Sequence, residues 1–358
     1  MNAPQLNNNQ TNPTISVVLP AFNAEKYVRE AVQSVFAQSF TNFELIIIND
    51  GSTDGTLAIL EELREQDRRI IIVSRENKGL VQSLNEGLDL ARGPWIARMD
   101  ADDIALPHRF ERQLQWLELT GADMCGSWIK LFGASDKRIV KLPQTDEAIK
   151  MWLLFAAAFA HPTVMMRAKL IKKIRYDKVW EKCEDYDLWE RAVRAGWIMT
   201  NVPEVLLLYR QHESQTSSRS SAYQQMLSQK IRRRLWQFRF DSFKLQKEWI
   251  DEVLKLREPS LTNPNMDYVD TVFIELLQRN HGETRATILE HATRLYFRAA
   301  STCPDIVARW SKLNRSYGTR WEANTKIKLW LLRVFRIHSS SSSFGLLKSL
   351  YLKFIRTR

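Results

Sequence analysis

The chain has 358 residues, which is more than one hydrophobic core usually serves and indicates a main domain with an appendage. Its formal net charge is +11 at pH 7. No apolar run approaches the ~20 residues that a membrane-spanning helix needs. The polar start, residues 1–13, does not resemble a signal peptide, so we expect it to be disordered. The three cysteines, Cys125, Cys183 and Cys303, show no pairing pattern or metal-ligand spacing, which suits a reducing cytoplasm.

The first hundred residues alternate between two patterns. Short apolar runs predict strands, and apolar residues at helical spacing predict helices. The predicted strands cover residues 15–20, 44–49, 70–73 and 95–99, and the predicted helices cover 25–37, a segment from about 56, and 80–91. Strands that are apolar on both faces and alternate with helices form parallel sheets covered by helices. The fold class is therefore α/β, with a mostly parallel sheet.

Polar residues follow each of these strands. They are Asn23 and Glu25 after the first strand, Asp50 and Asp54 after the second, Asn77 and Lys78 after the third, and Asp100 and Asp102 after the fourth. Ligands of open α/β sheets bind beyond the carboxyl ends of the strands. The sequence therefore predicts a ligand site at this edge, although Asp54 could simply cap the helix that follows it.

The most acidic of these segments is Asp100-Ala101-Asp102-Asp103. Aspartates crowded together repel one another unless a positive charge is present. Mg²⁺ or Mn²⁺, shared with substrate phosphates, is the natural occupant of such an oxygen-rich site. The alternative is a solvated acidic turn that caps a helix beginning near Pro107.

Four stretches in order resemble the inverting, nucleotide-sugar-dependent glycosyltransferases of family two, which have the GT-A fold. They are VVLPAFNAEKYVREAVQSVFAQSF, IINDGSTDGT, ENKGL and ARMDADD, and the resemblance covers about residues 14 to 212. It implies a GT-A, Rossmann-like catalytic domain. The Gln-x-x-Arg-Trp signature of processive members is absent, which favours the addition of single sugars.

The resemblance also implies roles for individual residues. The predicted contacts to the donor nucleotide-sugar are Pro20, Ala21, Asn23, Glu25, Asp50, Asn77, Lys78, Gly79, Asp100, Ala101 and Arg210. Within this set, Asp50 would accept a hydrogen bond from the base. Asp102 would bind the metal, with His212 as a second ligand, and Asp103 would hold the loop or share the metal.

A second acidic cluster precedes a helical run that ends at Gly196. By resemblance Asp185 is the catalytic base that takes the proton of the acceptor hydroxyl, and Glu184 is the second candidate. The alternative is an acidic helix N-terminus that the helix dipole favours. His161 is expected to be structural or to line the acceptor site.

The region beyond residue 214 has a different character. A Ser-rich linker, Ser214 to Ser221, leads into helical sequence dense in Lys, Arg, Trp and Phe. Residues 320–358 contain nine Lys or Arg and one acid, a net charge of +8, interleaved with aromatic and aliphatic residues. This composition favours a helix on an anionic membrane. Packing on the catalytic domain is the alternative, and nucleic-acid binding is not expected.

Three domains are therefore expected: a disordered N-terminus (1–13), a catalytic domain (14–213) and a basic helical region (214–358). The predicted enzyme is a glycosyltransferase of hexosyltransferase type that uses a UDP-sugar and Mn²⁺ or Mg²⁺. Its acceptor would be a glycan or a lipid-linked, lipopolysaccharide-type molecule at the inner face of the bacterial plasma membrane. The alternatives are a nucleotidyltransferase, whose Gly- and Lys/Arg-rich N-terminal signature is missing, or a non-catalytic sugar-nucleotide-binding protein.

Overall fold

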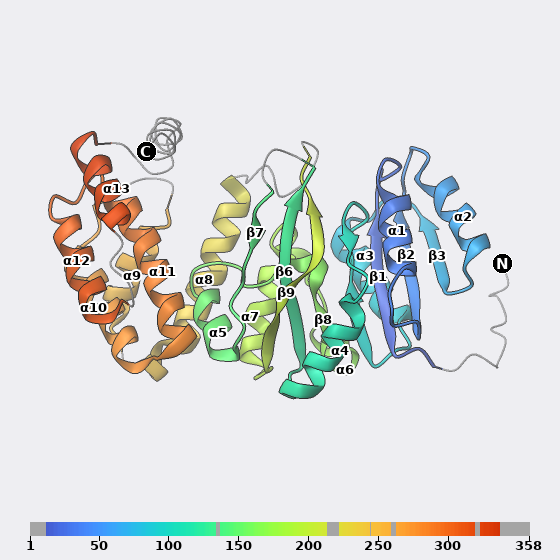
Figure 1. Ribbon diagram of the computed structural model, residues 1–358, viewed down its shortest axis with the longest axis horizontal. Helices are drawn as coiled ribbons and strands as arrows, with labels where there is room; N and C mark the ends of the chain where they lie inside the picture. The colour runs from blue at the N-terminus through green and yellow to red at the C-terminus, as the bar shows by residue number, and fades with distance from the viewer. Residues whose placement is uncertain are drawn as a thin grey trace. The chain divides into compact units, whose positions relative to one another are not determined.

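The computed structural model describes residues 12–133, 137–212, 222–243, 245–258, 263–318 and 323–336. The chain forms two compact units (Figure 1). The first takes the chain up to Asp146 and again from Ala157 to Gln224, and the second takes Glu147–Ala156 and the chain from Gln225 onward. The predicted Ser-rich linker at 214–221 and the last part of the basic tail, from residue 337, lie outside the described residues.

The first unit is built on a single mixed sheet. Its strands are β1 (Ile15–Ala21), β2 (Phe43–Asp50), β3 (Ile70–Arg75), β4 (Trp95–Arg98), β5 (Ile104–Ala105), β6 (Met124–Phe132), β7 (Ile139–Val140), β8 (Met165–Arg167) and β9 (Met199–Arg210). They lie in the order β3-β2-β1-β4-β8-β6-β9-β5, with β7 beside β6. The pairs among β3, β2, β1 and β4 are parallel, as the sequence predicts. Strand β8 pairs antiparallel with both β4 and β6, so the second half of the sheet is mixed.

Helices cover both faces of the parallel strands (Figure 1). They are α1 (Val28–Phe36), α2 (Thr56–Gln66), α3 (Leu80–Leu90) and α4 (Arg109–Thr120). Every residue of β2 is buried, which explains its continuous apolar run. Apolar side chains of α1, α2 and α4 share one core with alternate residues of β1 and β2, while α3 packs on the same two strands. The carboxyl ends of the four strands are thereby fixed along one edge.

The remaining short elements of the first unit follow the parallel strands. They are η1 (His161–Thr163), α6 (Ala168–Ile174), η2 (Lys178–Trp180) and α7 (Glu184–Arg194). Helix α7 begins at Glu184, directly at the second acidic cluster, and most of its residues are buried. The sheet flanked by helices and followed by a helical region is the α/β arrangement that the sequence predicts.

The second unit is helical in its described residues. Its helices are α5 (Asp146–Leu153), most of α8 (Ala222–Phe243), α9 (Lys247–Lys255), α10 (Met266–Arg279), α11 (Gly282–Ala299), α12 (Ile306–Tyr317) and α13 (Ala323–Val334). Phe155 lies at its core, with ring centroids 5.7 Å from Trp236 and 4.6 Å from His291. This aromatic packing explains why Glu147–Ala156 groups with the C-terminal helices rather than with the sheet.

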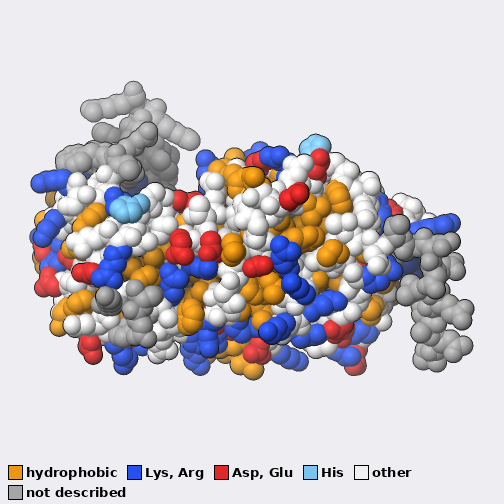
Figure 2. Space-filling model, turned by 90° about the horizontal axis from the view of Figure 1, so that it is seen from below, with side chains coloured by type: hydrophobic (Ala, Val, Ile, Leu, Met, Phe, Trp, Pro, Cys, Tyr) orange, Lys and Arg blue, Asp and Glu red, His pale blue; other side chains and the backbone are white. Residues whose placement is uncertain are grey.

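Two surface properties of the chain complete the description. No helix within the described ranges combines the length and the apolar content that crossing a bilayer requires. On the face shown in Figure 2, Lys and Arg side chains are widely spread, with Asp and Glu scattered among them. This distribution agrees with the net charge of +11.

Candidate active site

The polar residues predicted to contact a donor follow the ends of adjacent parallel strands. Pro20 and Ala21 are the last two residues of β1, and Ala21 pairs with Asn49 of β2. Asp50 ends β2 beside Arg75, the last residue of β3. Three groups of side chains form along this edge: one in the loop after β1, one around Asp50, and one after β4.

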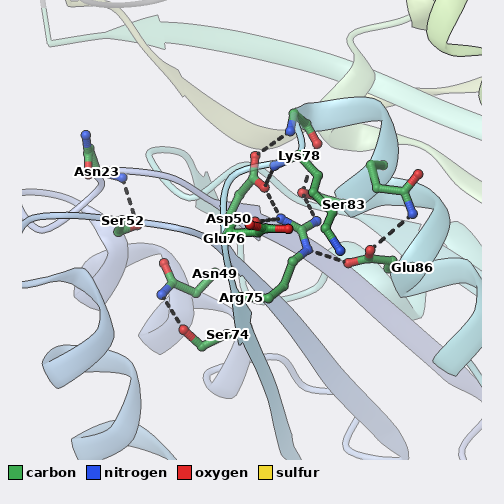
Figure 3. A network of polar contacts seen from close by, with 12 residues as sticks. Asn23, Asn49, Asp50, Ser52, Ser74, Arg75, Glu76, Lys78, Ser83 and Glu86 are labelled. Carbon is green, nitrogen blue, oxygen red and sulfur yellow. Dashed lines mark hydrogen bonds and ion pairs between the residues drawn. The ribbon is translucent and has the colours of Figure 1, made fainter.

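The loop after β1 is fastened to the loop after β2. The backbone N–H of Asn23 donates to Ser52 Oγ at 3.0 Å (Figure 3), and Asn23 Oδ1 accepts from the N–H of Thr53 at 2.8 Å. Glu25 Oε2 accepts from the N–H of Gly55 at 2.8 Å. Asn23 and Glu25, two of the predicted donor contacts, therefore also fix the geometry of the loop after β2.

Asp54 has the arrangement of a helix cap. Its Oδ1 accepts hydrogen bonds from the N–H and the hydroxyl of Thr56, at 3.0 and 2.5 Å. Burial acts to raise the pKa of Asp54, but the bonds from Thr56 outweigh it and the pKa is lowered. The carboxylate thus satisfies the start of α2, where backbone N–H groups have no helical partner.

Asp50 is the centre of the second group (Figure 3). Its side chain is almost fully buried and accepts the backbone N–H of Lys78 at 2.8 Å and that of Gly79 at 3.1 Å. It also forms an ion pair with Arg75, whose Nε lies 2.8 Å from a carboxylate oxygen of Glu86. Asp50 therefore holds the loop between β3 and α3 in place.

Two adjacent loops, the loop after β2 and the loop between β3 and α3, each contain a glycine that their geometry requires. Gly79, the residue before α3, has φ of 90°, and Gly51 has φ of 71°, both in the left-handed region that favours glycine. A Cβ atom at Gly51 would lie 2.5 Å from the backbone nitrogen of Asn77. The side chains of Asn77 and Lys78 have no hydrogen-bond partner among the described residues, so they remain available to a ligand.

The third group is the acidic cluster after β4. Asp100, Asp102 and Asp103 each place one carboxylate oxygen within 4.8 Å of the others. Asp103 is fully buried and its Oδ2 has no hydrogen-bond partner, while Ala101 belongs to the hydrophobic core. Burial, then the charges of Asp100 and Asp102, raises the pKa of Asp103 well above its ordinary value. Such a cluster is stable only if positive charge compensates it.

Arginines supply part of this charge. Arg98, buried at the end of β4, forms an ion pair with Asp100. Arg210, the last residue of β9, donates its backbone N–H to Asp103 Oδ1 at 2.8 Å and its Nε–H to the carbonyl of Asp102 at 2.7 Å. Its guanidinium also lies 4.5 Å from the ring centroid of Tyr27. Arg210 thus contacts the carboxylate of Asp103 and the backbone of Asp102. The carboxylate of Asp102 has a further partner.

That partner is His212. Its Nε2 lies 2.9 Å from Asp102 Oδ2, and its ring centroid lies 5.1 Å from that of Tyr27 in a tilted arrangement. The two predicted metal ligands are therefore neighbours. The carboxylate oxygens of Asp100, Asp102 and Asp103, with the His212 imidazole beside Asp102, fit Mg²⁺ or Mn²⁺.

Glu184 and Asp185 begin α7. Glu184 is buried with Oε2 unpartnered, and burial together with the charge of Asp185 raises its pKa to about 7. Asp185 Oδ1 accepts from the N–H of Tyr186 at 2.7 Å. Burial raises the pKa of Asp185, and the charges of Arg98 and Asp100 also act on it. The second acidic cluster therefore lies within electrostatic reach of the first.

His161 is buried, and its ring centroid lies 6.0 Å from that of Trp189 in α7. Its Nε2 lies 2.9 Å from the Tyr176 hydroxyl, and burial, with the charge of Arg98, lowers the pKa of His161 well below its ordinary value. The backbone of Tyr176 is held by Asn85 of α3 through bonds of 2.9 and 3.1 Å. A neutral, hydrogen-bonded His161 agrees with the structural or acceptor-lining role expected for it.

Sequence reasoning did not single out Arg98, Arg109 or Tyr176. A signal for Arg98 existed, because a charged residue inside an otherwise apolar strand must find a partner when buried. Arg109 and Tyr176 gave no such local signal. Their contacts come from elements that are distant in the sequence.

Comparisons with known proteins agree with this geometry. The family model described as Glycosyl transferase family 2 matches residues 16–175. A Haemophilus influenzae protein named as an uncharacterized glycosyltransferase is 37% identical over 235 residues, which are 62% of this chain and 72% of that protein. The O-antigen biosynthesis glycosyltransferase WbnJ of Escherichia coli is 34% identical over 225 residues, covering 61% of this chain and 87% of WbnJ.

Solved structures give the same fold. The crystal structure of S. aureus TarS 1–349 in complex with UDP-GlcNAc matches with a TM-score of 0.54 and 17% identity, covering 85% of this chain and 90% of that one. This likeness supports the GT-A type of fold. The family itself is shown by the sequence relatives. The chain belongs to glycosyl transferase family 2 and is a glycosyltransferase.

Proposed function

We propose that the enzyme transfers a single sugar from a UDP-sugar to a hydroxyl of a glycan or lipid-linked acceptor, with inversion of configuration. The observation that carries this proposal is the placement of two carboxylate clusters. Asp100, Asp102 and Asp103 lie at the end of β4, and the charge of Asp100 acts on Asp185 at the start of α7. One cluster suits a metal and a diphosphate, and the other suits a base.

Asp102 and His212 would hold Mn²⁺ or Mg²⁺, and Asp103 Oδ2, which has no hydrogen-bond partner, belongs to the same acidic cluster. The ion, when bound, would neutralise the charge of the departing diphosphate. Arg210 would fix the backbone of Asp102 and the Oδ1 atom of Asp103 while other carboxylate oxygens bind the ion.

The donor would bind along the strand ends. The proposed contacts are Pro20, Ala21, Asn23, Glu25, Asp50, Asn77, Lys78, Gly79, Asp100, Ala101 and Arg210. Asp50 Oδ2 accepts one described bond, from Gly79, so a carboxylate lone pair remains for the imide N–H of a base. TarS, which shares the fold, was crystallised with UDP-GlcNAc, so UDP-sugars are the first donors to test.

Asp185 would act as the base. As the acceptor oxygen forms its bond to the anomeric carbon, the bond from that carbon to the diphosphate oxygen breaks, and the hydroxyl proton passes to the Asp185 carboxylate. A single displacement of this kind inverts the anomeric centre. Burial raises the pKa of Asp185, which strengthens it as a base near neutral pH. Glu184 is the second candidate for this role.

We further propose that the acceptor is met at the inner face of a bacterial plasma membrane. Helix α13 packs on α11 and α12 and buries Leu329 and Leu332, but Trp330, and Phe335 just after the helix, are 51% and 60% exposed. The region from residue 320 onward carries a net charge of +8. Exposed aromatic residues among cations favour attachment to an anionic bilayer.

A donor screen tests the proposed reaction. Purified enzyme would be heated with individual nucleotide sugars, with and without Mn²⁺, and then assayed for nucleotide release. We expect one UDP-sugar to raise the unfolding temperature in a Mn²⁺-dependent way and to be slowly hydrolysed. Stabilisation by nucleoside triphosphates with pyrophosphate release would favour a nucleotidyltransferase, and binding without turnover would favour a non-catalytic protein.

A further inference from the structure

Arg109, the first residue of α4, is a fully buried arginine without a carboxylate at hydrogen-bond distance among the described residues. Its Nη2 donates to the backbone carbonyl of Arg98 at 2.7 Å, its Nη1 to Met99 Sδ at 3.3 Å, and its Nε to Gln113 Oε1 at 3.1 Å. Two of these three contacts are to the residues directly before the acidic cluster.

We propose that Arg109 is a positioning residue that holds the end of β4 and compensates the charge of the acidic cluster, so that its carboxylates are set to receive a divalent cation. The proposal rests on the metal-assisted function proposed above. It assigns to Arg109 an action through the backbone and through charge, not a contact with substrate or metal.

The electrostatics support this assignment. A buried guanidinium is costly unless negative charge is close by. Burial, and then the charge of Arg98, lowers the pKa of Arg109 to about 9, while Cys125 and the charges of Asp103 and Asp100 act against this lowering. Because its hydrogen bonds go to neutral groups, the positive charge of Arg109 is not cancelled by a direct ion pair. The negative charges of Asp103 and Asp100 therefore offset part of the cost of burying the Arg109 guanidinium.

The same arginine links two parts of the site. Gln113, which accepts from Arg109, donates its Nε2–H to the carbonyl of Thr163 at 2.7 Å. Thr163 closes the η1 turn that carries His161. Arg109 and Gln113 thus connect the residues before the acidic cluster to the turn that carries His161. Loss of the Arg109 hydrogen bonds would weaken the support of both segments.

Two variants separate the geometric and electrostatic parts of this role. Arg109→Lys keeps the charge but cannot make the three planar contacts, and Arg109→Gln removes the charge. Arg112→Lys is the matched control, because Arg112 lies on the same helix, is exposed, and pairs with Glu204. Mn²⁺ affinity would be measured on each full-length protein by calorimetry and by electron paramagnetic resonance of free Mn²⁺, with the unfolding temperature recorded alongside.

We expect Arg109→Lys to weaken Mn²⁺ binding about tenfold and Arg109→Gln about a hundredfold, the range seen when groups behind metal ligands are replaced. Arg112→Lys should bind Mn²⁺ as the wild type does. Folded Arg109 variants with unchanged Mn²⁺ affinity would overturn the inference and leave Arg109 a purely structural residue. Should Arg109→Gln fail to fold, Arg109→Lys alone decides. A wild-type protein that binds no Mn²⁺ would instead overturn the proposed function.

Discussion

At the scale of single residues, the acidic cluster divides its carboxylates between two tasks. Asp100 is paired with Arg98, and Asp103 accepts a backbone bond from Arg210. Asp102 faces His212 instead, a residue that can release its hydrogen bond in exchange for a metal bond. Asp102 is therefore the carboxylate whose charge is most available to an ion.

Asp102→Asn tests this division. The amide keeps the shape of the side chain but removes a charge that Mg²⁺ or Mn²⁺ needs. We expect the transfer rate to fall at least a hundredfold, about 3 kcal/mol in the barrier, with an unchanged unfolding temperature. Asp251→Asn, which breaks only an ion pair in the helical unit, serves as the control. Near-native turnover of Asp102→Asn without added metal would contradict the role assigned to Asp102.

Asp185→Asn separates binding from chemistry. The base acts on the acceptor, so we expect transfer to be abolished while calorimetry finds donor affinity close to that of the wild type. Loss of both together would identify Asp185 as structural. The anomeric configuration of the wild-type product, measured by NMR, should be inverted, and retention would reject a single displacement.

Glu184 makes stability depend on pH. Its pKa rises from the ordinary 4.5 to about 7 in the folded protein because the carboxyl is buried beside Asp185. The stabilisation from binding this proton is complete below pH 4.5 and is lost as pH rises through about 7. Glu184→Gln should therefore stabilise the protein at pH 8 by at most about 3 kcal/mol and have little effect at pH 4.

Thermal unfolding of wild type and Glu184→Gln at both pH values measures this difference. Glu118→Gln, on the exposed side of α4, is the control and should shift neither curve. An equal effect of Glu184→Gln at pH 4 and pH 8 would show that the carboxyl is not held protonated by the fold.

At the scale of elements, the strand ends can form one site because hydrogen bonds join the loops that follow them. Asn23 and Glu25 hold the loop after β2, Asp50 holds the loop after β3, and Asn85 of α3 holds the backbone of Tyr176. The loops on the proposed donor side are thus joined by hydrogen bonds, so a displacement of one loop should also displace its neighbour.

Gly51→Ala tests this coupling. The added Cβ would lie 2.5 Å from the backbone nitrogen of Asn77, so the loop after β3 must move. Gly121→Ala, at φ of 64° with nothing near its Cβ, adds only backbone strain and is the matched control. We expect a loss of about 1–2 kcal/mol in unfolding free energy for Gly121→Ala and about 2–4 kcal/mol for Gly51→Ala. Only Gly51→Ala should raise the KM for the donor; equal KM values would contradict the coupling.

At the scale of the whole molecule, charge is distributed unevenly along the chain. Residues 320–358 hold a net +8 of the total +11. The described part of this region, residues 323–336, contains α13; Ile327, Trp330, Val334 and, just after the helix, Phe335 are exposed, while Leu329 and Leu332 are buried. One side of this helix therefore packs in the helical unit, and another presents apolar side chains to solvent.

Co-sedimentation with anionic liposomes tests the membrane proposal. The double variant Trp330→Ser with Phe335→Ser keeps the buried leucines, so it should fold yet bind vesicles at least tenfold more weakly. Deletion of 320–358 should abolish binding, since each cation adds roughly 1 kcal/mol near an anionic surface. Leu119→Ser, at an exposed leucine of α4, is the control. Vesicle binding that survives both changes would favour a tail that packs on the enzyme.

The amino-acid sequence alone determined the alternation of strands and helices in the first hundred residues and the edge at which Asp50, Asp100 and Asp102 would meet. These features follow from local periodicity and from the rule that parallel strands end at one edge. The tertiary structure alone decided which charges compensate the cluster and which helices Glu147–Ala156 joins. Arg210 reaches Asp103 from 107 residues away, and Arg109 reaches Arg98 from another element. Such contacts leave no local pattern, because they depend on how distant segments pack.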